Sequence, residues 1–282
     1  MTDNHFDALP APEIAHRAED VGIKKATNDT ISTFTLAVLA GGFVSMGAAF
    51  STTVVAGASE TVPYGIVRLL AGLSFSLGLV LIIGAGAELF TGNSLIIMAW
   101  ASRKVSTTAL LRNWLVVYTG NFVGSILSAL LMFLTNQYSY GGGAVGQAAL
   151  NTAVGKVNHD FVQALALGIM CNAMVCLAVW LTLGARSATD KILAITFPIT
   201  AFVTLSFEHS IANMYFVPMG LFIKQFDPAF VAKMGVDVSS LTVTNFINTL
   251  IPVTIGNIIG GVFMVAAVYW FIYLRPARAV GP

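Results

Sequence analysis

The sequence is poor in charged residues, and this scarcity sets the class of protein. Of its 282 residues 10% are charged and 56% are hydrophobic, with a mean hydropathy of +0.82. A soluble domain carries about 25% charged residues. The composition therefore predicts a protein embedded in a membrane. A formal net charge of +1 offers no clustered positive field, which excludes nucleic acid as a partner.

Several motifs are also missing. The only two cysteines, Cys171 and Cys176, lie in one apolar run, so neither a disulfide framework nor a metal site is expected, and no cofactor is expected either. The first 28 residues lack the apolar core and cleavage site of a secretory signal. No Asn-Pro-Ala occurs, which counts against a water or glycerol channel, although an uncharged-solute channel of aquaporin type remains the structural alternative. An intramembrane enzyme is disfavoured because no G-x-S-G motif or pair of membrane aspartates is present.

A polar run, Phe207-Glu208-His209-Ser210-Ile211-Ala212-Asn213, interrupts an otherwise apolar segment. The flanks, Ile192–Leu205 and Met214–Phe222, are each shorter than the ~20 residues that a membrane helix needs, but together they suffice. We predict one spanning helix that is broken in its middle. A break at membrane depth exposes backbone groups that only protein or a water-filled cavity can satisfy, so it is expected to line a pathway.

A second polar run, Glu88-Leu89-Phe90-Thr91-Gly92-Asn93, again places an Asn five residues after a Glu. The motif G-N-x-x-G also occurs twice, at Gly120 and Gly256, and is predicted to open the third and sixth spans, where small residues allow close helix packing. The six predicted spans are Ile31–Gly57, Tyr64–Trp100, Thr108–Thr135, Phe161–Leu183, Ile192–Phe222 and Phe246–Leu274. Since each half has three spans, the second half must enter from the opposite side. The fold class predicted is an all-α membrane protein with an inverted 3+3 repeat.

The predicted divisions of the chain are a cytoplasmic N-terminal helix segment (1–29), a first repeat (30–136), a periplasmic connector rich in glycine (137–158), a second repeat (159–275) and a cytoplasmic tail (276–282). Most Lys and Arg residues fall on the N-terminal side of the six spans. The positive-inside rule therefore predicts that both termini are cytoplasmic.

The N-terminal segment can form a short helix over Pro12–Ala26, with Ile14, Ala18, Val21 and Lys25 on one face. We expect a surface helix. The alternative is a gate over a pore mouth, in which His16 titrates because the ordinary pKa of histidine lies in the working range.

His209 is the only histidine inside a predicted span, and an ionisable group at membrane depth points to function. The short helices after the breaks aim unpaired N–H groups at the gap, which favours an anion. Thr91, Asn93, Ser94 and Asn213 suit the capping of these helices. Asn172, in the fourth span, is expected either to donate its amide to the pathway or to bond a neighbouring helix.

Two carboxylates complicate the prediction of an anion pathway, because bare charges in the pore would repel the substrate. Glu88 and Glu208 are expected to point away from the pathway and accept backbone N–H bonds, or to be protonated; if they lined it ionised, a cation channel would be favoured. The large apolar residues near the breaks either pack or form dry constrictions. These residues are Phe75, Leu79, Leu89, Phe90, Val175 and Phe202.

The segments Ala87–Asn93 and Phe207–Tyr215, together with Gly120-Asn121, Cys171-Asn172 and Gly256-Asn257, resemble the formate–nitrite transporters, most nearly their bacterial formate-conducting branch. The likeness covers nearly the whole chain. It implies an aquaporin-like protomer of a homopentamer in the bacterial inner membrane, passing formate and related small monovalent anions. The nitrite and hydrosulfide branches share these motifs, so other short monocarboxylates, nitrite and hydrosulfide remain alternative substrates.

The resemblance also implies roles for individual residues. Thr91 and His209 would lie at the pore centre with Asn172 nearby, and Lys156 at the outer entrance would concentrate the anion. Phe75 and Phe202 would form the outer constriction and Leu79, Leu89 and Phe90 the inner one. A dry constriction makes a bare carboxylate costly, so His209 is expected to neutralise the substrate by giving it a proton, which makes transport pH-linked.

Overall fold

The computed structural model describes residues 7–58 and 62–275, and this part of the chain is helical without any β-strand. The predicted cytoplasmic tail, 276–282, lies outside the described residues. The helices of the first half are α1 (Ala11–Thr27), α2 (Thr30–Val55), α3 (Tyr64–Phe75), α4 (Leu77–Ala85), the short 3-10 helix η1 (Gly92–Leu95), α5 (Ile96–Ala101) and α6 (Thr107–Leu134). The later helices are η2 (Gln137–Ser139), η3 (Gly141–Gly143), α7 (Ala144–Val157), α8 (Phe161–Gly184), α9 (Ala188–Thr204), α10 (Ser210–Phe226), α11 (Pro228–Met234), α12 (Val243–Ile259), η4 (Gly260–Ala266), α13 (Ala267–Tyr269) and η5 (Trp270–Leu274).

Five helices in the described residues are long and apolar enough to cross a membrane: Thr30–Val55, Tyr64–Ala85, Thr107–Leu134, Phe161–Gly184 and Val243–Leu274. The predicted span Ile192–Phe222, expected to be broken in its middle, forms two helices, α9 and α10, each 17 residues long. In the predicted span Tyr64–Trp100, the part before the break, Tyr64–Ala85, reaches spanning length by itself.

The helices start where short polar side chains cap them. Asp29 accepts a hydrogen bond from Ser32 N at the start of α2, and Asp160 accepts one from Gln163 N at the start of α8. Each cap satisfies one of the N–H groups that a helix leaves unpaired at its first turn. Two of the longest helices therefore begin at residues that the sequence defines locally.

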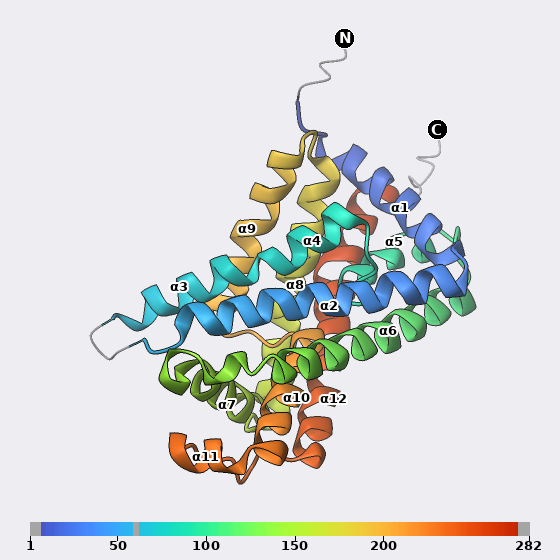
Figure 1. The fold of residues 1–282 in the computed structure, drawn as a ribbon. Helices are drawn as coiled ribbons and strands as arrows, with labels where there is room; N and C mark the ends of the chain where they lie inside the picture. The colour runs from blue at the N-terminus through green and yellow to red at the C-terminus, as the bar shows by residue number, and fades with distance from the viewer. Residues whose placement is uncertain (1–6, 59–61, 276–282) are drawn as a thin grey trace, which may run out of the picture.

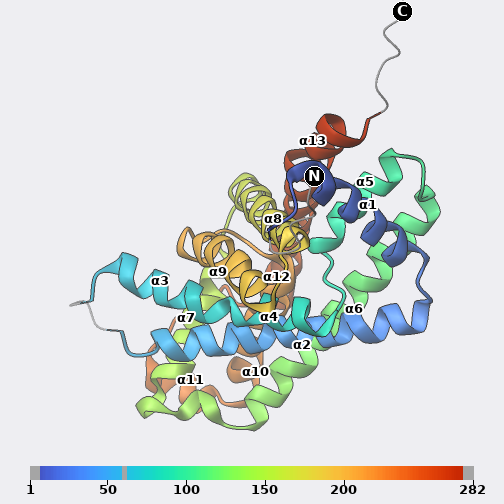
Figure 2. The same ribbon diagram turned by 90° about the horizontal axis from the view of Figure 1, so that it is seen from above.

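Glycines set the closest helix contacts. The most extensive pairings are α2 with α6 and α8 with α12 (Figures 1 and 2). A Cβ atom at Gly124 would lie 2.0 Å from Val38 O, and one at Gly260 would lie 2.0 Å from Ile169 O, so no larger residue fits. The G-N-x-x-G motifs thus permit close packing, but the prediction that they open their spans is wrong: both lie in the middle of a continuous helix.

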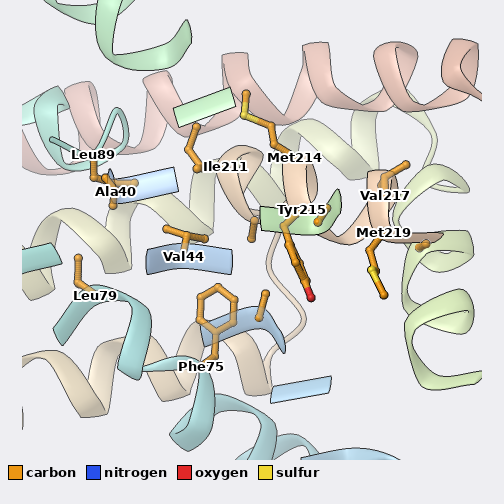
Figure 3. Packing of buried hydrophobic residues seen from close by; sticks show 14 of the residues in the cluster. Ala40, Val44, Phe75, Leu79, Leu89, Ile211, Met214, Tyr215, Val217 and Met219 are labelled. Carbon is orange, nitrogen blue, oxygen red and sulfur yellow. The ribbon is translucent and has the colours of Figure 1, made fainter. Parts of the chain in front are cut away.

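The predicted glycine-rich connector, 137–158, is largely helical. After the turns at Gly141–Gly143, α7 buries Val145, Ala149, Leu150 and Ala153 on one face and packs against α10. These positions follow a helical period that the small residues between them obscure in the sequence. Figure 3 shows the neighbouring core, in which Val44 and Phe75 lie beside Ile211 and other buried side chains of α10.

Helix α1 forms where the sequence predicted it and packs against α5, with Ile14, Ala15 and Ala18 buried. It also contacts η5, so the two described ends of the chain lie at one end of the molecule (Figure 1). His16 is exposed on its outer face. Lys25, in the last turn of α1, bonds to Glu88 at the first break in chain order, which lies within the polar run Glu88–Asn93.

Candidate functional site

The second break in chain order, within the polar run Phe207–Asn213, separates α9 from α10. Ser206 takes a left-handed conformation at φ 58°, Phe207 N bonds back to Phe202 O at 3.0 Å, and the chain then runs extended through His209 into α10. Glu208 N donates to Leu167 O of α8 at 3.3 Å. The break therefore has a defined backbone path.

One buried amide holds this path in place. Asn257, near the end of α12, donates from Nδ2 to Glu208 O and to Gly168 O, both at 2.9 Å, and its Oδ1 accepts from Ser210 N at 2.9 Å. These bonds satisfy backbone groups that the break would otherwise leave unpaired in an apolar setting. Asn257 thus acts as a brace between two helices and the break.

The first break repeats the arrangement. Gly86 is left-handed at φ 70°, Ala87 N bonds to Ile82 O, and Glu88 N donates to Leu36 O at 3.2 Å. Asn121, in the middle of α6, donates to Glu88 O and Ala37 O at 2.9 and 2.8 Å and accepts from Phe90 N at 2.9 Å.

The two carboxylates are buried and held by side chains. Glu88 accepts bonds from Lys25 Nζ at 3.0 Å and from Asn93 Nδ2 at 2.7 Å. Glu208 accepts bonds from Lys156 Nζ at 2.6 Å and Asn213 Nδ2 at 2.8 Å. The expectation of backbone N–H donors is therefore wrong, because lysine and asparagine side chains reach these oxygens first.

His159, in the turn before α8, is a third partner of Glu208, with Nε2 3.3 Å from Oε1. The hydrogen bond to the Glu208 carboxylate raises the pKa of His159 above its ordinary value, against an opposing effect of burial.

The breaks meet at a contact between two polar side chains. His209 Nε2 lies 3.0 Å from Thr91 Oγ1, and both residues are buried. His209 Nδ1 accepts a bond from Ala212 N at 3.1 Å and so caps α10. With Nδ1 as an acceptor, the proton of the neutral imidazole is on Nε2 and is donated to Thr91 Oγ1. The hydroxyl hydrogen of Thr91 is then free to point at a third group.

A cavity of about 70 Å³ adjoins His209, and we call it the vestibule. At ~30 Å³ for each water in the liquid, it has room for about two waters or one small ion. It is lined by Ser51, Thr52, Val55, Arg68, Ala71, Phe75, Thr152, Lys156, Phe202, Val203, Phe207, His209, Ala212 and Phe216.

Aromatic rings border the vestibule. The Phe75 and Phe202 rings meet edge to face with centroids 5.7 Å apart, and the Phe202 ring lies 6.1 Å from the His209 imidazole. Leu79, Leu89 and Phe90 are buried together in the main core. The Phe90 ring packs against Tyr118 at 4.8 Å.

The comparisons with known proteins agree with one another. A model of the formate/nitrite transporter family matches residues 12–271. The chain belongs to this family. It is 47% identical to the formate channel FocA of Escherichia coli strain K12, over 97% of each chain, and 39% identical to FocA of Haemophilus influenzae, over 90% of this chain and 91% of that one. A solved structure of a pentameric formate channel with formate bound is 47% identical, with a TM-score of 0.82 over 87% of this chain and 98% of that one.

In this member of the formate/nitrite transporter family, Asn172 has no amide hydrogen left for a pathway. Its Nδ2 donates to Asn257 O at 2.6 Å, with Ser94 Oγ and Thr91 O at 3.1 and 3.2 Å. Of the two roles expected for Asn172, the structure therefore shows the bond between helices. Val175, one turn further along α8, is buried in the core.

Lys156, which the resemblance places at the outer entrance, lines the vestibule, and its ammonium group is paired with Glu208. The pairing arises because α7 ends beside the second break.

Four residues of the site had no predicted role there: Lys25, Asn121, His159 and Asn257. Asn121 and Asn257 were visible as members of a packing motif and of the segments that carry the family resemblance, and the shared Asn was the available signal. Among the described residues no group of three His, Cys, Asp or Glu side chains is placed to hold a metal ion.

Proposed function

We propose that this chain is a protomer of a pentameric channel for formate and related small monovalent anions in a bacterial inner membrane. The observation that carries the proposal is the Thr91–His209 pair at 3.0 Å, set beside a small cavity and bordered by buried apolar side chains. The relatives named as formate channels, and the pentameric formate channel of similar fold, support the substrate and the assembly.

The proposed architecture is an inverted repeat of six spans, with α9 and α10 together completing the fifth. Support comes from the matching bonds at the two breaks. Further support comes from a hydrogen bond at 2.9 Å between Tyr118 and Thr254. These two residues lie 136 positions apart, the same separation as between Asn121 and Asn257. A contact between equivalent residues is expected where a twofold axis passes. In this scheme residues 30–136 and 159–275 form the two repeats, 1–29 and 276–282 are cytoplasmic, and 137–158 is periplasmic.

The proposed pathway runs from the vestibule, past Phe75 and Phe202, to the centre and then past Leu79, Leu89, Phe90 and Val175. Lys156 marks the outer entrance. The buried pairs Glu88–Asn93 and Glu208–Asn213 keep the breaks in shape, and Asn172 braces the centre.

At the centre the anion meets an apolar wall that penalises its charge. In the proposed relay His209, protonated on both nitrogens, passes its Nε2 proton to Thr91 Oγ1 while the Thr91 hydroxyl proton moves to the carboxylate. The products are a neutral acid, an intact hydroxyl and a neutral imidazole. The neutral imidazole left by this step carries its hydrogen on Nδ1, so the bond from Ala212 N returns only when Nδ1 releases that hydrogen and Nε2 takes up another.

The test is formate flux into proteoliposomes at several pH values. His209→Phe removes both ring nitrogens and is expected to abolish the pH-linked component. The pH-linked formate flux should fall by roughly 10²-fold or more, which is the usual contribution of a positioned proton donor. His209→Asn is the matched control for folding, since its carbonyl oxygen can still cap α10 without relaying a proton.

Parental flux and pH profile in both variants would contradict the relay. If the parent protein carried no formate but carried nitrite, hydrosulfide or another short monocarboxylate, that other anion would be its substrate. Swelling with glycerol in place of anion flux would favour the uncharged-solute channel.

A further inference from the structure

The wall of the vestibule contains three ionisable side chains, Arg68, Lys156 and His209, and no carboxylate among the described residues. His209 is neutral in the arrangement observed, because Nδ1 accepts a bond. The electrostatic character of the vestibule therefore depends on the two cations, and their surroundings differ.

The positive charge of Lys156 is offset by the carboxylate of Glu208. Its Nζ lies 2.6 Å from Glu208 Oε1, and His159 Nε2 lies 3.3 Å from the same oxygen. A close ion pair has little net field at a distance, since the two contributions oppose each other. Lys156 with Glu208 therefore adds little net positive charge to the vestibule.

The charge of Arg68 is not matched. Within residues 7–58 and 62–275 no carboxylate oxygen lies within ion-pair distance of its guanidinium group. One nitrogen, Nη2, donates to Val203 O at the end of α9, and Nε–H is buried with no acceptor among the residues that the structure describes. A buried donor that lacks a partner is a candidate site for an ion or a water.

A structural role explains only part of this arrangement. The bond to Val203 O satisfies a carbonyl near the end of α9, where a positive charge is favoured by the helix dipole. A single donor is enough for that bond. Arg68 lines the vestibule, and within the described residues no carboxylate offsets its charge, which is not needed to hold α9.

We propose that Arg68 is the residue that draws a small monovalent carboxylate into the vestibule and binds it there, before the anion passes Phe75 and Phe202. A guanidinium presents a planar fork of donors that matches a carboxylate. Lys156, held by Glu208, forms the opposite wall rather than the primary attraction. This inference rests on the proposed function, since it concerns the anion that the channel admits.

The experiment measures initial rates of formate uptake into proteoliposomes as a function of formate concentration. Ionic strengths of about 0.01 M and about 0.1 M are compared, between which the screening length falls from ~30 to ~10 Å. In the parent protein the half-saturating concentration should rise with salt. In Arg68→Gln it should start roughly 10-fold higher, the lower end of the effect of charged clefts on ion concentration, and change little with salt.

Arg68→Lys should keep the salt dependence, because it keeps the charge, with a smaller rise in half-saturation from the lost fork. Lys233→Gln is the matched control, since it removes one positive charge from an exposed position on α11 outside the vestibule. It should behave like the parent protein. Val55→Asp leaves Arg68 in place and adds a carboxylate to the vestibule wall, so it should reproduce Arg68→Gln even if that variant does not assemble.

Unchanged half-saturation and an unchanged salt dependence in Arg68→Gln and Val55→Asp would overturn the inference while leaving formate transport intact. A parent protein that carries no formate would instead refute the proposed function.

Discussion

The two breaks share a scaffold and differ in what they present to the centre. Aligned on their glutamates, Gly86 matches Ser206, Asn93 matches Asn213, and each break is braced by one buried Asn. Leu89, however, stands where the second break has His209. The backbone arrangement is thus repeated, while the residue proposed to carry protons occurs once.

The helices that follow the breaks differ as well. The first break leads into the short η1 and α5, whereas the second leads into the 17-residue α10. The side chain of His209 caps α10, a bond that Leu89 has no polar atom to make. The chemistry at the centre therefore pairs Thr91 of one break with a nonequivalent residue of the other.

The counter-ions follow a common plan. Lys25 lies four residues before Asp29, the cap of α2, and Lys156 lies four residues before Asp160, the cap of α8. In each half the helix that precedes the first long helix thus brings a lysine to the buried glutamate. Asn93 Oδ1 also accepts from Lys25 at 3.0 Å, whereas Asn213 Oδ1 has no partner in the described part of the chain.

The largest effect is expected from removing either brace. Asn121→Ala and Asn257→Ala each leave one carbonyl and one N–H of a break without a partner, whereas the carbonyls of Ala37 and Gly168 keep the bonds of their own helices. At ~1–3 kcal/mol for each buried unsatisfied group, both variants should lose most of their stability and melt far below the parent protein in detergent. Asn151→Ala, an exposed position on α7, is the control. A large loss in only one of the two variants would show that the breaks are not equivalent in energy.

Substitution of the two buried glutamates should destabilise the protein to different extents. Glu208→Gln leaves Lys156 and His159 beside a neutral side chain at the more deeply buried position, where breaking an ion pair costs about 3–5 kcal/mol. Glu88→Gln affects Lys25 alone, whose side chain is 27% exposed and can be solvated, so a smaller loss is expected. Thermal unfolding of both variants measures the difference, and equal losses would mean that burial does not distinguish them.

A smaller effect is expected at the left-handed residue before each break. A Cβ at Gly86 meets no atom within 4 Å, so Gly86→Ala should cost only the backbone strain, about 1 kcal/mol. Ser206 already carries a Cβ in this conformation, so Ser206→Ala should be nearly neutral. The melting temperatures of the pair test this, and a clear loss in Ser206→Ala would instead assign weight to its hydroxyl group.

The sequence allowed the helical class, five long helices and the two polar interruptions to be predicted, because hydropathy and cap residues are local signals. Bonds that join distant segments were not accessible. Asn121 is 33 residues from the carbonyl of Glu88, and Lys25 is 63 residues from the carboxylate of Glu88, so neither contact has a local pattern. The helix α7 was missed because its first residues follow three glycines, and the charge balance of Lys156 depended on where α7 ends.

The smallest effect concerns pH and belongs to the second break alone. Because the bond to Glu208 raises the pKa of His159 in the folded protein, the protonated histidine adds stability that is fully present below the unfolded pKa near 6.5. This contribution should fade as pH rises through the folded value. Melting temperature measured against pH should therefore fall above about pH 6.5, and His159→Gln should remove that part of the slope.

Asn28 stands at the equivalent position, one residue before Asp29, so Asn28→Gln should leave the pH dependence unchanged. A slope that survives in His159→Gln would place the titrating group elsewhere and remove this difference between the halves.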